Sequence, residues 1–460
     1  MFSFILGIGG GILTILSFPP FKYNYLIWFS PIPFYYVQAK GRSLTLAIMG
    51  WGFIFFGYEL HFFPRDAFIS LMVASLVQFL LLAFLLDKIS KSRASPPFIL
   101  LLPTLWVLLE FAEDKGFLGI PLYIFKFFSA PWLSLGVALS DHPVSLIASF
   151  LGVWGLSFLI LLVGGIIYRL LYLKKIVFLS LLLSLLLSSS FLYKVDYQKA
   201  SDLKVGLIQP CVSSESLKLP TAGISRDIRL SALLFFQKNL DLIVWPVSYT
   251  EGGAFPPDSI AKYMSTFARE YHCYLAVGVD RLNKRMIFYS LNGDILGEFK
   301  KEYLIPFIDW FPHKGKVYQE IKEESRIMKA EKFTFGILLG TEVGHPSLSR
   351  RLLNKGAGFI LVISDEPFPD LLLANATLRA IEAGSYLIFS DNFGPSSLVS
   401  PNGGKKEIPP GVSSTLFGGI SSFAKGSLFL FVGPYWIFFL LILLFIDYLL
   451  KLRYSRSNSP

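Results

Sequence analysis

The chain has 460 residues, of which 53% are apolar, 16% are aromatic and only 16% are charged, and its mean hydropathy is +0.56. This composition excludes an ordinary soluble enzyme and predicts an integral membrane protein. The formal net charge is +10. Because the basic residues gather beside apolar segments, we attribute this charge to membrane topology and expect no nucleic-acid partner.

Eight apolar segments each approach the roughly 20 residues that are needed to cross a bilayer core. They cover about residues 3–19, 23–38, 43–63, 67–86, 97–111, 144–170, 176–192 and 427–450. The second and the fifth are short and contain prolines, so each is either a plain span or a re-entrant or kinked segment. The sequence therefore predicts a helical bundle of about eight spans.

The basic residues predict the orientation of these spans, because Lys and Arg in short loops concentrate on the cytoplasmic side. Each cluster follows an even-numbered segment: Lys40 and Arg42; Lys88, Lys91 and Arg93; Arg169, Lys174 and Lys175; Lys451, Arg453 and Arg456. This parity predicts that both termini are cytoplasmic and that the long segment before the last span is extracytoplasmic. The first segment lacks the basic start and cleavage site of a signal peptide, so we expect it to be an anchor.

We predict a membrane domain with seven spans at 1–193, a globular domain at 194–426, a closing span at 427–450 and a cytoplasmic tail at 451–460. The globular domain alternates predicted strands and helices. The strands are expected at 204–209, 240–245, 275–279, 286–290, 333–339, 358–364 and 386–390, and helices at 258–271 and 370–383. This alternation predicts a layered α/β domain, a sheet-on-sheet sandwich with outer helices. We expect loops at 211–225 and 390–422.

Four local patterns in the globular domain resemble the nitrilase, or carbon–nitrogen hydrolase, superfamily. They are Val244-Trp245-Pro246, the turn at 301–307, the strand and turn at 336–342 followed by Pro346 and Arg350-Arg351, and the segment at 378–384. The membrane part adds Phe18-Pro19-Pro20-Phe21 and the segment at 152–158. With this span pattern, the whole chain resembles the apolipoprotein N-acyltransferase family. The resemblance implies an α-β-β-α sandwich on the periplasmic side of the bacterial inner membrane.

What the resemblance implies for chemistry is a Glu–Lys–Cys triad without a metal or other cofactor. In such a triad the cysteine thiolate takes an acyl chain from a phospholipid, the glutamate acts as general base and acid, and the lysine stabilises the oxyanion. The α-amino group of a diacylglyceryl-cysteine at the N-terminus of a bacterial lipoprotein then attacks the thioester. Phospholipid and lipoprotein are the partners that the resemblance implies.

The family pattern is only partly present at these positions. Lys301 matches the triad lysine, whereas Val247 stands at the base position and Gly340 at the nucleophile position. An isopropyl group takes no proton, and glycine offers no nucleophile. Two carboxylates remain as supporting candidates, Glu342 after the nucleophile position and Asp309 in place of the glutamate of the family's Pro-Phe-Gly-Glu. Both are also consistent with a purely structural role, in which they hold the turn through backbone groups and Lys301.

Other residues offer substitute chemistry. Cys211 and Cys273 lie away from the nucleophile turn and are interpreted as small buried or bridged cysteines, with a relocated nucleophile as the alternative. The hydroxyl of Thr341 is expected to face away from the site, since neighbouring strand residues point to opposite sides. Glu251 lies in a glycine-rich loop and either points into solvent or swings inward. His345 is interpreted as a loop residue, and no spacing indicates a metal.

The expected loss of catalytic rate indicates that the covalent acyl-transfer mechanism of the family is absent. Removing a member of an interdependent catalytic group commonly costs about 10⁴–10⁶ in rate, and here the base and the nucleophile are both replaced. The leading hypothesis is a family member that has lost the covalent mechanism and retains lipid or lipoprotein binding. One alternative is an active acyltransferase with another nucleophile, or with direct lysine-assisted transfer. Another is a non-catalytic membrane scaffold.

Overall fold

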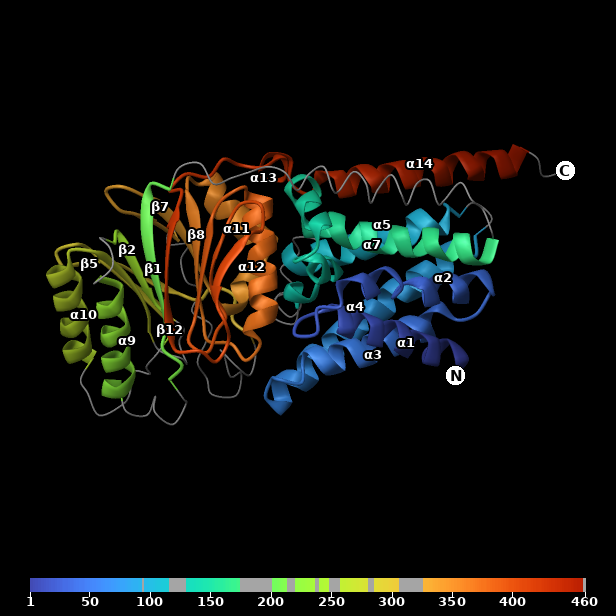
Figure 1. Cartoon of the computed structure of the whole chain (residues 1–460). Coiled ribbons are helices and arrows are strands. Elements are labelled where there is room, and N and C mark those ends of the chain that lie inside the picture. The colour runs from blue at the N-terminus through green and yellow to red at the C-terminus, as the bar shows by residue number, and fades with distance from the viewer. Residues whose placement is uncertain are drawn as a thin grey trace, which may run out of the picture. The chain divides into compact units, whose positions relative to one another are not determined.

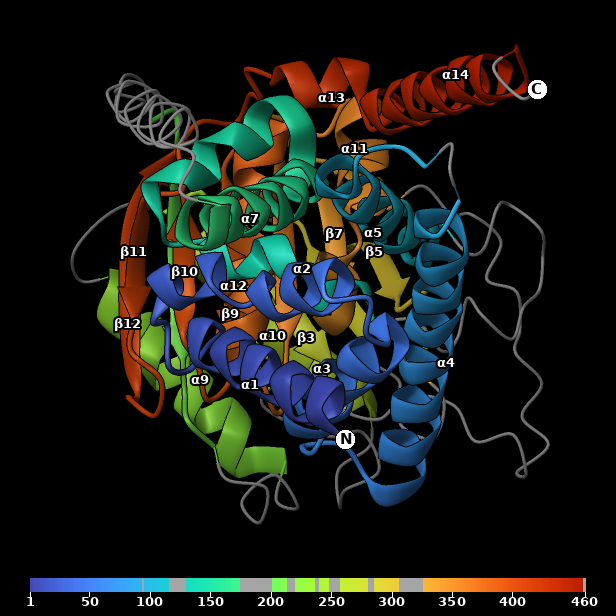
Figure 2. The ribbon, with the colours of Figure 1, turned by 90° about the vertical axis from the view of Figure 1, so that its right-hand side faces the viewer.

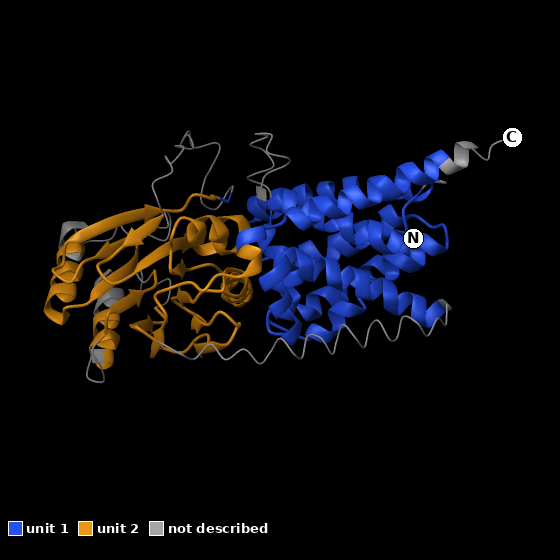
Figure 3. Ribbon diagram, turned by 90° about the horizontal axis from the view of Figure 1, so that it is seen from above, with its two compact units in different colours: residues 1–194, 305–308, 431–460 blue, residues 195–304, 309–430 orange. Residues whose placement is uncertain are grey.

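The computed structural model describes residues 1–92, 95–115, 130–173, 201–212, 220–235, 240–247, 257–279, 285–305 and 326–457. The chain divides into two compact units, shown in different colours in Figure 3. Unit 1 comprises residues 1–194, 305–308 and 431–460, and unit 2 comprises residues 195–304 and 309–430.

Unit 1 is helical. Its α-helices are α1 (Phe2–Ser17), α2 (Ile32–Ala39), α3 (Leu44–Glu59), α4 (Arg65–Ser90), α5 (Phe98–Lys115), α7 (Ala148–Leu173) and α14 (Tyr435–Ser457). Among the described residues, three segments are long and apolar enough to cross a membrane: Arg65–Ser90, Pro143–Tyr172 and Tyr435–Arg453. The helices at 2–17 and 44–59 are apolar but shorter. The span expected at 176–192 lies outside the described residues, so the count of eight stays a prediction.

Close packing of α1 against α3 depends on residues without a side chain (Figure 2). A Cβ added at Gly7 would collide with the carbonyl oxygen of Ala47, and one added at Gly50 would collide with that of Phe4. The second apolar segment is not one continuous helix. It forms a 3₁₀ turn, η1 (Asn24–Trp28), followed by the short α2. This interruption agrees with the proline-containing sequence of the segment.

Unit 2 contains two six-stranded sheets. The first has the order β12-β1-β2-β3-β4-β5, with β1 (Leu203–Gln209), β2 (Leu242–Trp245), β3 (Tyr274–Val279), β4 (Arg285–Tyr289), β5 (Ile295–Lys300) and β12 (Ser414–Ile420). The three central strands β1, β2 and β3 are parallel, and the others pair antiparallel.

The second sheet has the order β11-β10-β9-β8-β7-β6. Its strands are β6 (Ile327–Lys329), β7 (Thr334–Leu339), β8 (Phe359–Ser364), β9 (Leu387–Asp391), β10 (Ser396–Val399) and β11 (Lys405–Ile408). Here β7, β8 and β9 are parallel. The carboxyl ends of β7 and β8 therefore meet at one edge of the sheet, where loop residues from both strands come together.

Figure 1 shows the two sheets face to face, with α9 (Pro220–Phe235) and α10 (Pro257–Tyr271) outside the first and α11 (Pro346–Asn354) and α12 (Pro369–Ala383) outside the second. Strand alternation explains the layers. Val244 joins the core between the sheets, whereas its neighbours Ile243 and Trp245 join the core beneath the outer helices. The predicted sandwich with outer helices is thus confirmed.

The seven predicted strands and two predicted helices of this domain all occur, but both predicted loops are wrong in part. Helix α9 begins within 211–225, and the segment 390–422 contains β10, β11 and β12. Strand β12 pairs antiparallel with β1 over its whole length. That pairing joins residues roughly 200 positions apart, so a local search for strand signals in a Gly- and Ser-rich segment does not find it.

Candidate functional site

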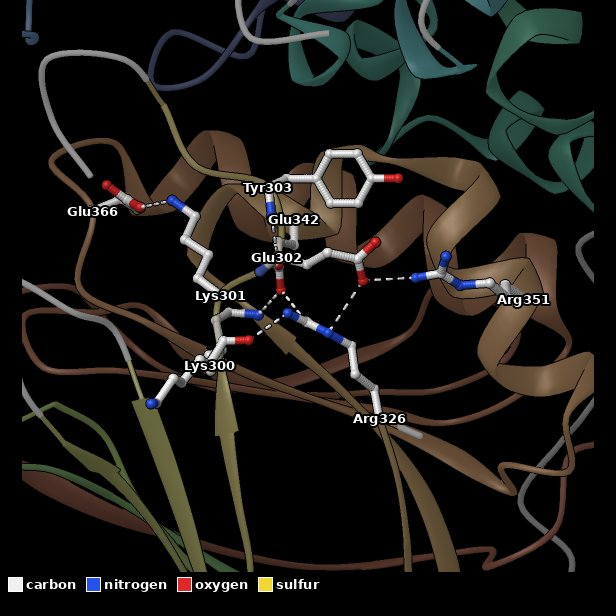
Figure 4. Close-up of polar contacts among 9 residues, drawn as sticks. Lys300, Lys301, Glu302, Tyr303, Arg326, Glu342, Arg351 and Glu366 are labelled. Carbon is white, nitrogen blue, oxygen red and sulfur yellow. Dashed lines mark hydrogen bonds and ion pairs between the residues drawn. The ribbon is translucent and has the colours of Figure 1, made fainter. Parts of the chain in front are cut away.

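Three loops of unit 2 converge at the candidate site, which Figure 4 shows in close-up. Lys301 follows β5, Gly340 follows β7, and Glu366 lies just beyond β8. Because β7 and β8 are parallel neighbours, Gly340 and Glu366 emerge at the same edge of the sheet. This placement is the usual one for functional groups in sheets with parallel strands.

The carboxylate of Glu342 is fully buried and is the centre of a network around the turn after β7. Its Oε1 accepts hydrogen bonds from the backbone N–H groups of Glu302 and Tyr303, at 2.5 and 3.0 Å. Its Oε2 accepts one from the backbone N–H of Leu339 at 2.8 Å. These bonds tie the turn at 339–342 to the turn that carries Lys301, which is the role that the structural interpretation of Glu342 predicted.

The cation that pairs with Glu342 is Arg326 rather than Lys301. An Nη1 of Arg326 lies 2.5 Å from Glu342 Oε2, and its Nη2 donates to the backbone carbonyl of Lys300. The same guanidinium lies 3.4 Å from a carboxylate oxygen of Glu302, which also pairs with Arg351 at 2.8 Å. Arg326 is largely buried, so this network is a structural clamp beneath the site.

Lys301 is buried, and its Nζ lies 3.4 Å from Oε1 of Glu366. The exposed fractions of the two side chains are 0% and 2%. Neither is therefore a surface charge. Burial of an ammonium group is costly unless an anion compensates it, and Glu366 provides such an anion in the part of the chain that the structure describes.

Gly340 adopts φ = +55°, in the left-handed region that favours glycine. An ideal Cβ built on this residue would lie only 2.5 Å from Oε1 of Glu366. At such a distance one of the two groups would have to shift. Glu366 thus occupies the space that a side chain at position 340 would enter, and the same carboxylate oxygen pairs with Lys301.

Val247 lies two residues beyond the end of β2 at Trp245 and is only 4% exposed. It packs in the apolar core between the two sheets. Its backbone N–H group and Ile363 flank Gly278 so closely that a Cβ there would lie 2.8 Å from Val247 N. The position that the resemblance predicts for the base is therefore part of the apolar core. The other carboxylate candidates, Asp309 and Glu251, lie outside the described residues.

The substitute nucleophiles show no sign of activation. Cys211 and Cys273 are both free thiols, so they do not form a disulfide bond with each other. Burial raises the pKa of the half-buried Cys211 thiol and raises the pKa of Cys273 to about 12, so at neutral pH both are thiols rather than thiolates. Thr341 is buried. His345 lies between the turn after β7 and α11, as its interpretation as a loop residue predicted. It is buried, and its ring centroid lies 4.3 Å from that of Tyr303 with the two rings tilted by 36°.

Sequence reasoning missed Glu366 and Arg326. The signal for Glu366 was a pair of acidic residues directly after the apolar run 359–364, at the carboxyl end of a predicted strand. Arg326 directly precedes β6, a strand that was not predicted. Among the described residues no group of three or more His, Cys, Asp or Glu side chains could hold a metal ion.

These features define a chain that combines an α-β-β-α sandwich with helices long and apolar enough to cross a membrane. Residues 10–166 match the model of the apolipoprotein N-acyltransferase N-terminal domain. The apolipoprotein N-acyltransferase of Coxiella burnetii is 24% identical, over 87% of this chain and 90% of that protein. That of Photobacterium profundum is 23% identical, over 88% and 86%. The chain is thus similar to the apolipoprotein N-acyltransferase family over most of its length.

Solved structures similar to this chain include members of the nitrilase superfamily and a carbon–nitrogen hydrolase. Saccharomyces cerevisiae Nit3, a member of branch 10 of that superfamily, matches with 18% identity and a TM-score of 0.40, over 48% of this chain and 90% of Nit3. A carbon–nitrogen hydrolase from Helicobacter pylori matches with 16% identity and the same TM-score, over 48% of this chain and 89% of the hydrolase.

Proposed function

We propose that this chain is an apolipoprotein N-acyltransferase family member that no longer transfers acyl groups through a covalent acyl-enzyme and that retains binding of phospholipid or of a bacterial lipoprotein. Lys301 holds the position of the triad lysine, Gly340 that of the nucleophile and Val247 that of the base. Glu342 and Asp309 are supporting residues.

The observation that carries this proposal is the geometry at the end of β7. An acyl-enzyme needs a nucleophile beside the oxyanion-stabilising lysine. At this place Gly340 has no side chain, and the space beside its Cα is filled by a carboxylate that pairs with Lys301. Val247 lies in the apolar core, and neither cysteine is held as a thiolate. No described group replaces the reactive thiolate of the family.

One observation favours a second candidate function, which is direct acyl transfer without an acyl-enzyme. The pair Lys301–Glu366 brings together an ammonium group and a carboxylate. In direct transfer, the acceptor amine attacks the phospholipid ester carbonyl, Glu366 takes the amine proton, and the ammonium of Lys301 stabilises the oxyanion until the lysophospholipid alcohol leaves with a proton. A non-catalytic membrane scaffold is the third candidate.

We further propose the membrane arrangement that the sequence predicts. The bundle has about eight spans in the bacterial inner membrane, seven of them in residues 1–193 and the last at 427–450. The sandwich, at 194–426, lies on the periplasmic side, and residues 451–460 form a cytoplasmic tail. The even-numbered placement of the basic clusters supports this arrangement.

One experiment separates the three candidates. The full chain is purified in detergent and incubated with phospholipid and a diacylglyceryl-cysteine peptide, and both the protein and the peptide are analysed by mass spectrometry. The leading proposal expects neither acyl-protein nor triacylated peptide, together with saturable binding of the phospholipid or the peptide. Direct transfer expects triacylated peptide without acyl-protein, and a scaffold expects neither product nor binding.

A further inference from the structure

The most unusual group at the site is the buried side chain of Glu366. Only 2% of this side chain is exposed, and its Oε1 lies 3.4 Å from Nζ of Lys301. The backbone N–H of Glu366 contacts the Oγ of Ser364, which closes the turn after β8. The carboxylate is therefore directed toward Lys301 from a buried position in the loop after β8.

Oε1 of Glu366 also occupies the space that a side chain at position 340 would need. An ideal Cβ on Gly340 would lie 2.5 Å from Glu366 Oε1 and 3.3 Å from the carboxyl carbon. A carboxylate thus lies at the end of β7, beside a buried ammonium group, in the space that a reactive side chain at position 340 would need.

We propose that Glu366 acts as an internal ligand of the candidate site, because its carboxylate occupies the volume beside Gly340 and Lys301. Removing this carboxylate by substitution then opens a binding site for a small external carboxylate. This inference depends only on the geometry and holds whether or not the chain transfers acyl groups. The ligand class is a short monocarboxylate. Acetate reproduces the atoms that Glu366→Ala removes beyond Cβ, which makes it the matched probe.

The physical reason for binding is electrostatic. Without the carboxylate of Glu366, the buried ammonium of Lys301 loses an anionic partner, and breaking a buried ion pair is strongly destabilising. An anion that enters the vacated volume restores that pair and stabilises only the folded state. A longer acid such as butyrate exceeds the vacated volume and is expected to bind less well.

The test is thermal unfolding of the detergent-solubilised full chain in sodium acetate, with sodium chloride at the same ionic strength as the reference. Glu366→Ala is expected to lower Tm by roughly 5–15 °C, and acetate is expected to restore at least half of that loss with saturation. Wild type is expected to show no such shift. The double variant Glu366→Ala/Lys301→Met is also expected to show no acetate-induced shift of Tm, because it lacks the ammonium group that binds acetate.

A matched control measures the general effect of acetate on a protein that has lost a carboxylate. Glu298→Ala removes the carboxylate partner of Arg285 on the surface, where the side chain of Glu298 is 41% exposed. This variant is expected to respond to acetate as wild type does. An equal acetate response in wild type and in Glu366→Ala, or a response that persists without Lys301, would overturn the proposal.

A second measurement does not require Glu366→Ala to fold. Gly340→Ala introduces a Cβ at positive φ and against Glu366, whereas Gly411→Ala introduces one at φ = +74° with nothing within 4 Å. Both variants carry the backbone strain of an L-residue in this region, but only the first displaces the carboxylate. Gly340→Ala is expected to lower Tm at least twice as much as Gly411→Ala. Equal losses would contradict the occupancy that we infer for Glu366.

Discussion

The carboxylate of Glu366 lies where a side chain on Gly340 would have to go, with 2.5 Å between its Oε1 and the ideal Cβ position. Introducing a nucleophile at position 340, where the resemblance predicts one, is therefore not a change at one residue. The flexible carboxylate end of Glu366 has to shift at the same time, away from the position in which it pairs with Lys301.

This relationship changes the design of a rescue experiment. Gly340→Cys with Val247→Glu supplies a thiol and a base, which act as a unit. In the presence of Glu366 we expect this double variant to form no acyl adduct, because the carboxylate fills the thiol's place. Adding Glu366→Ala is expected to allow a hydroxylamine-sensitive adduct on the introduced cysteine, detected by mass spectrometry of the protein after incubation with phospholipid.

Two controls belong to this experiment. The triple variant with Lys301→Met added is expected to lose most of the adduct, since the oxyanion loses its stabilising charge. Each variant is first checked for a folded, monodisperse protein in detergent. A folded triple variant without adduct would mean that the surrounding pocket has also changed, and would favour the scaffold candidate.

A second prediction concerns the clamp between Arg326 and Glu342. Arg326→Met leaves the fully buried carboxylate of Glu342 without the cation 2.5 Å away, and removing one partner of a buried pair costs about 3–5 kcal/mol. Arg285→Met is the matched control, since the side chain of its partner Glu298 is 41% exposed, and an ion pair with an exposed partner contributes about 0–1 kcal/mol. Thermal unfolding of both variants in detergent measures the difference, and equal losses would show that Arg326 is not a structural clamp.

Much of the sandwich could be predicted from sequence, because its strands and helices carry local signals. The apolar runs at 333–339 and 358–364 predicted two strands. The observed strands β7 and β8 each begin one residue later and end at the same residue. Lys301 was singled out by its match to the family lysine in the turn at 301–307, whereas β5, the strand before it, was not predicted. Strand β12 was missed because its stability comes from pairing with β1 rather than from its own Gly-containing sequence.

The composition of the site could be predicted only in part, for a related reason. That Lys301 would pair with Glu366 depends on the arrangement of β5, β7 and β8, which joins residues 65 positions apart. That Arg326 rather than Lys301 would neutralise Glu342 depends on the register between β6 and β7. Neither relationship can be recognised from a local sequence pattern. Glu366 and Arg326 were therefore not predicted as residues of the site.

A third prediction follows from Asp391 at the end of β9, where burial and the neighbouring Asp365 raise the pKa of the carboxyl group to about 8. Between the pKa of the unfolded chain, near 4, and about 8, the folded state binds a proton that the unfolded state has released. Stability is therefore expected to fall as pH rises through this window, with a slope of up to about 1.4 kcal/mol per pH unit.

Asp391→Asn keeps an oxygen that accepts the N–H groups of Phe393 and Gly394 and removes the titration. This variant is expected to flatten the pH dependence of Tm between pH 5 and pH 9 relative to wild type. Asp294→Asn, in an exposed hairpin, is the control and is expected to leave the pH profile unchanged. Parallel profiles for wild type and Asp391→Asn would contradict a protonated Asp391.

A fourth prediction tests the membrane arrangement. The parity of the basic clusters predicts that a topology reporter fused near Ser290 is active only outside the cytoplasm and that one fused after Pro460 is active only inside. Paired alkaline phosphatase and fluorescent-protein fusions at each position check both sides. Activity of the two reporters on the same side would overturn the eight-span arrangement.

The most direct test of the central claim is a search for the acyl-enzyme itself. The wild-type chain is incubated with phospholipid in detergent, and the intact protein and its peptides are analysed by mass spectrometry before and after hydroxylamine, with the double variant Cys211→Ser/Cys273→Ser as the thiol-free reference. We expect the mass of the wild-type protein to stay unchanged, as in the reference. A hydroxylamine-sensitive acyl group on Cys211 or Cys273 would contradict the loss of the covalent mechanism and identify a relocated nucleophile.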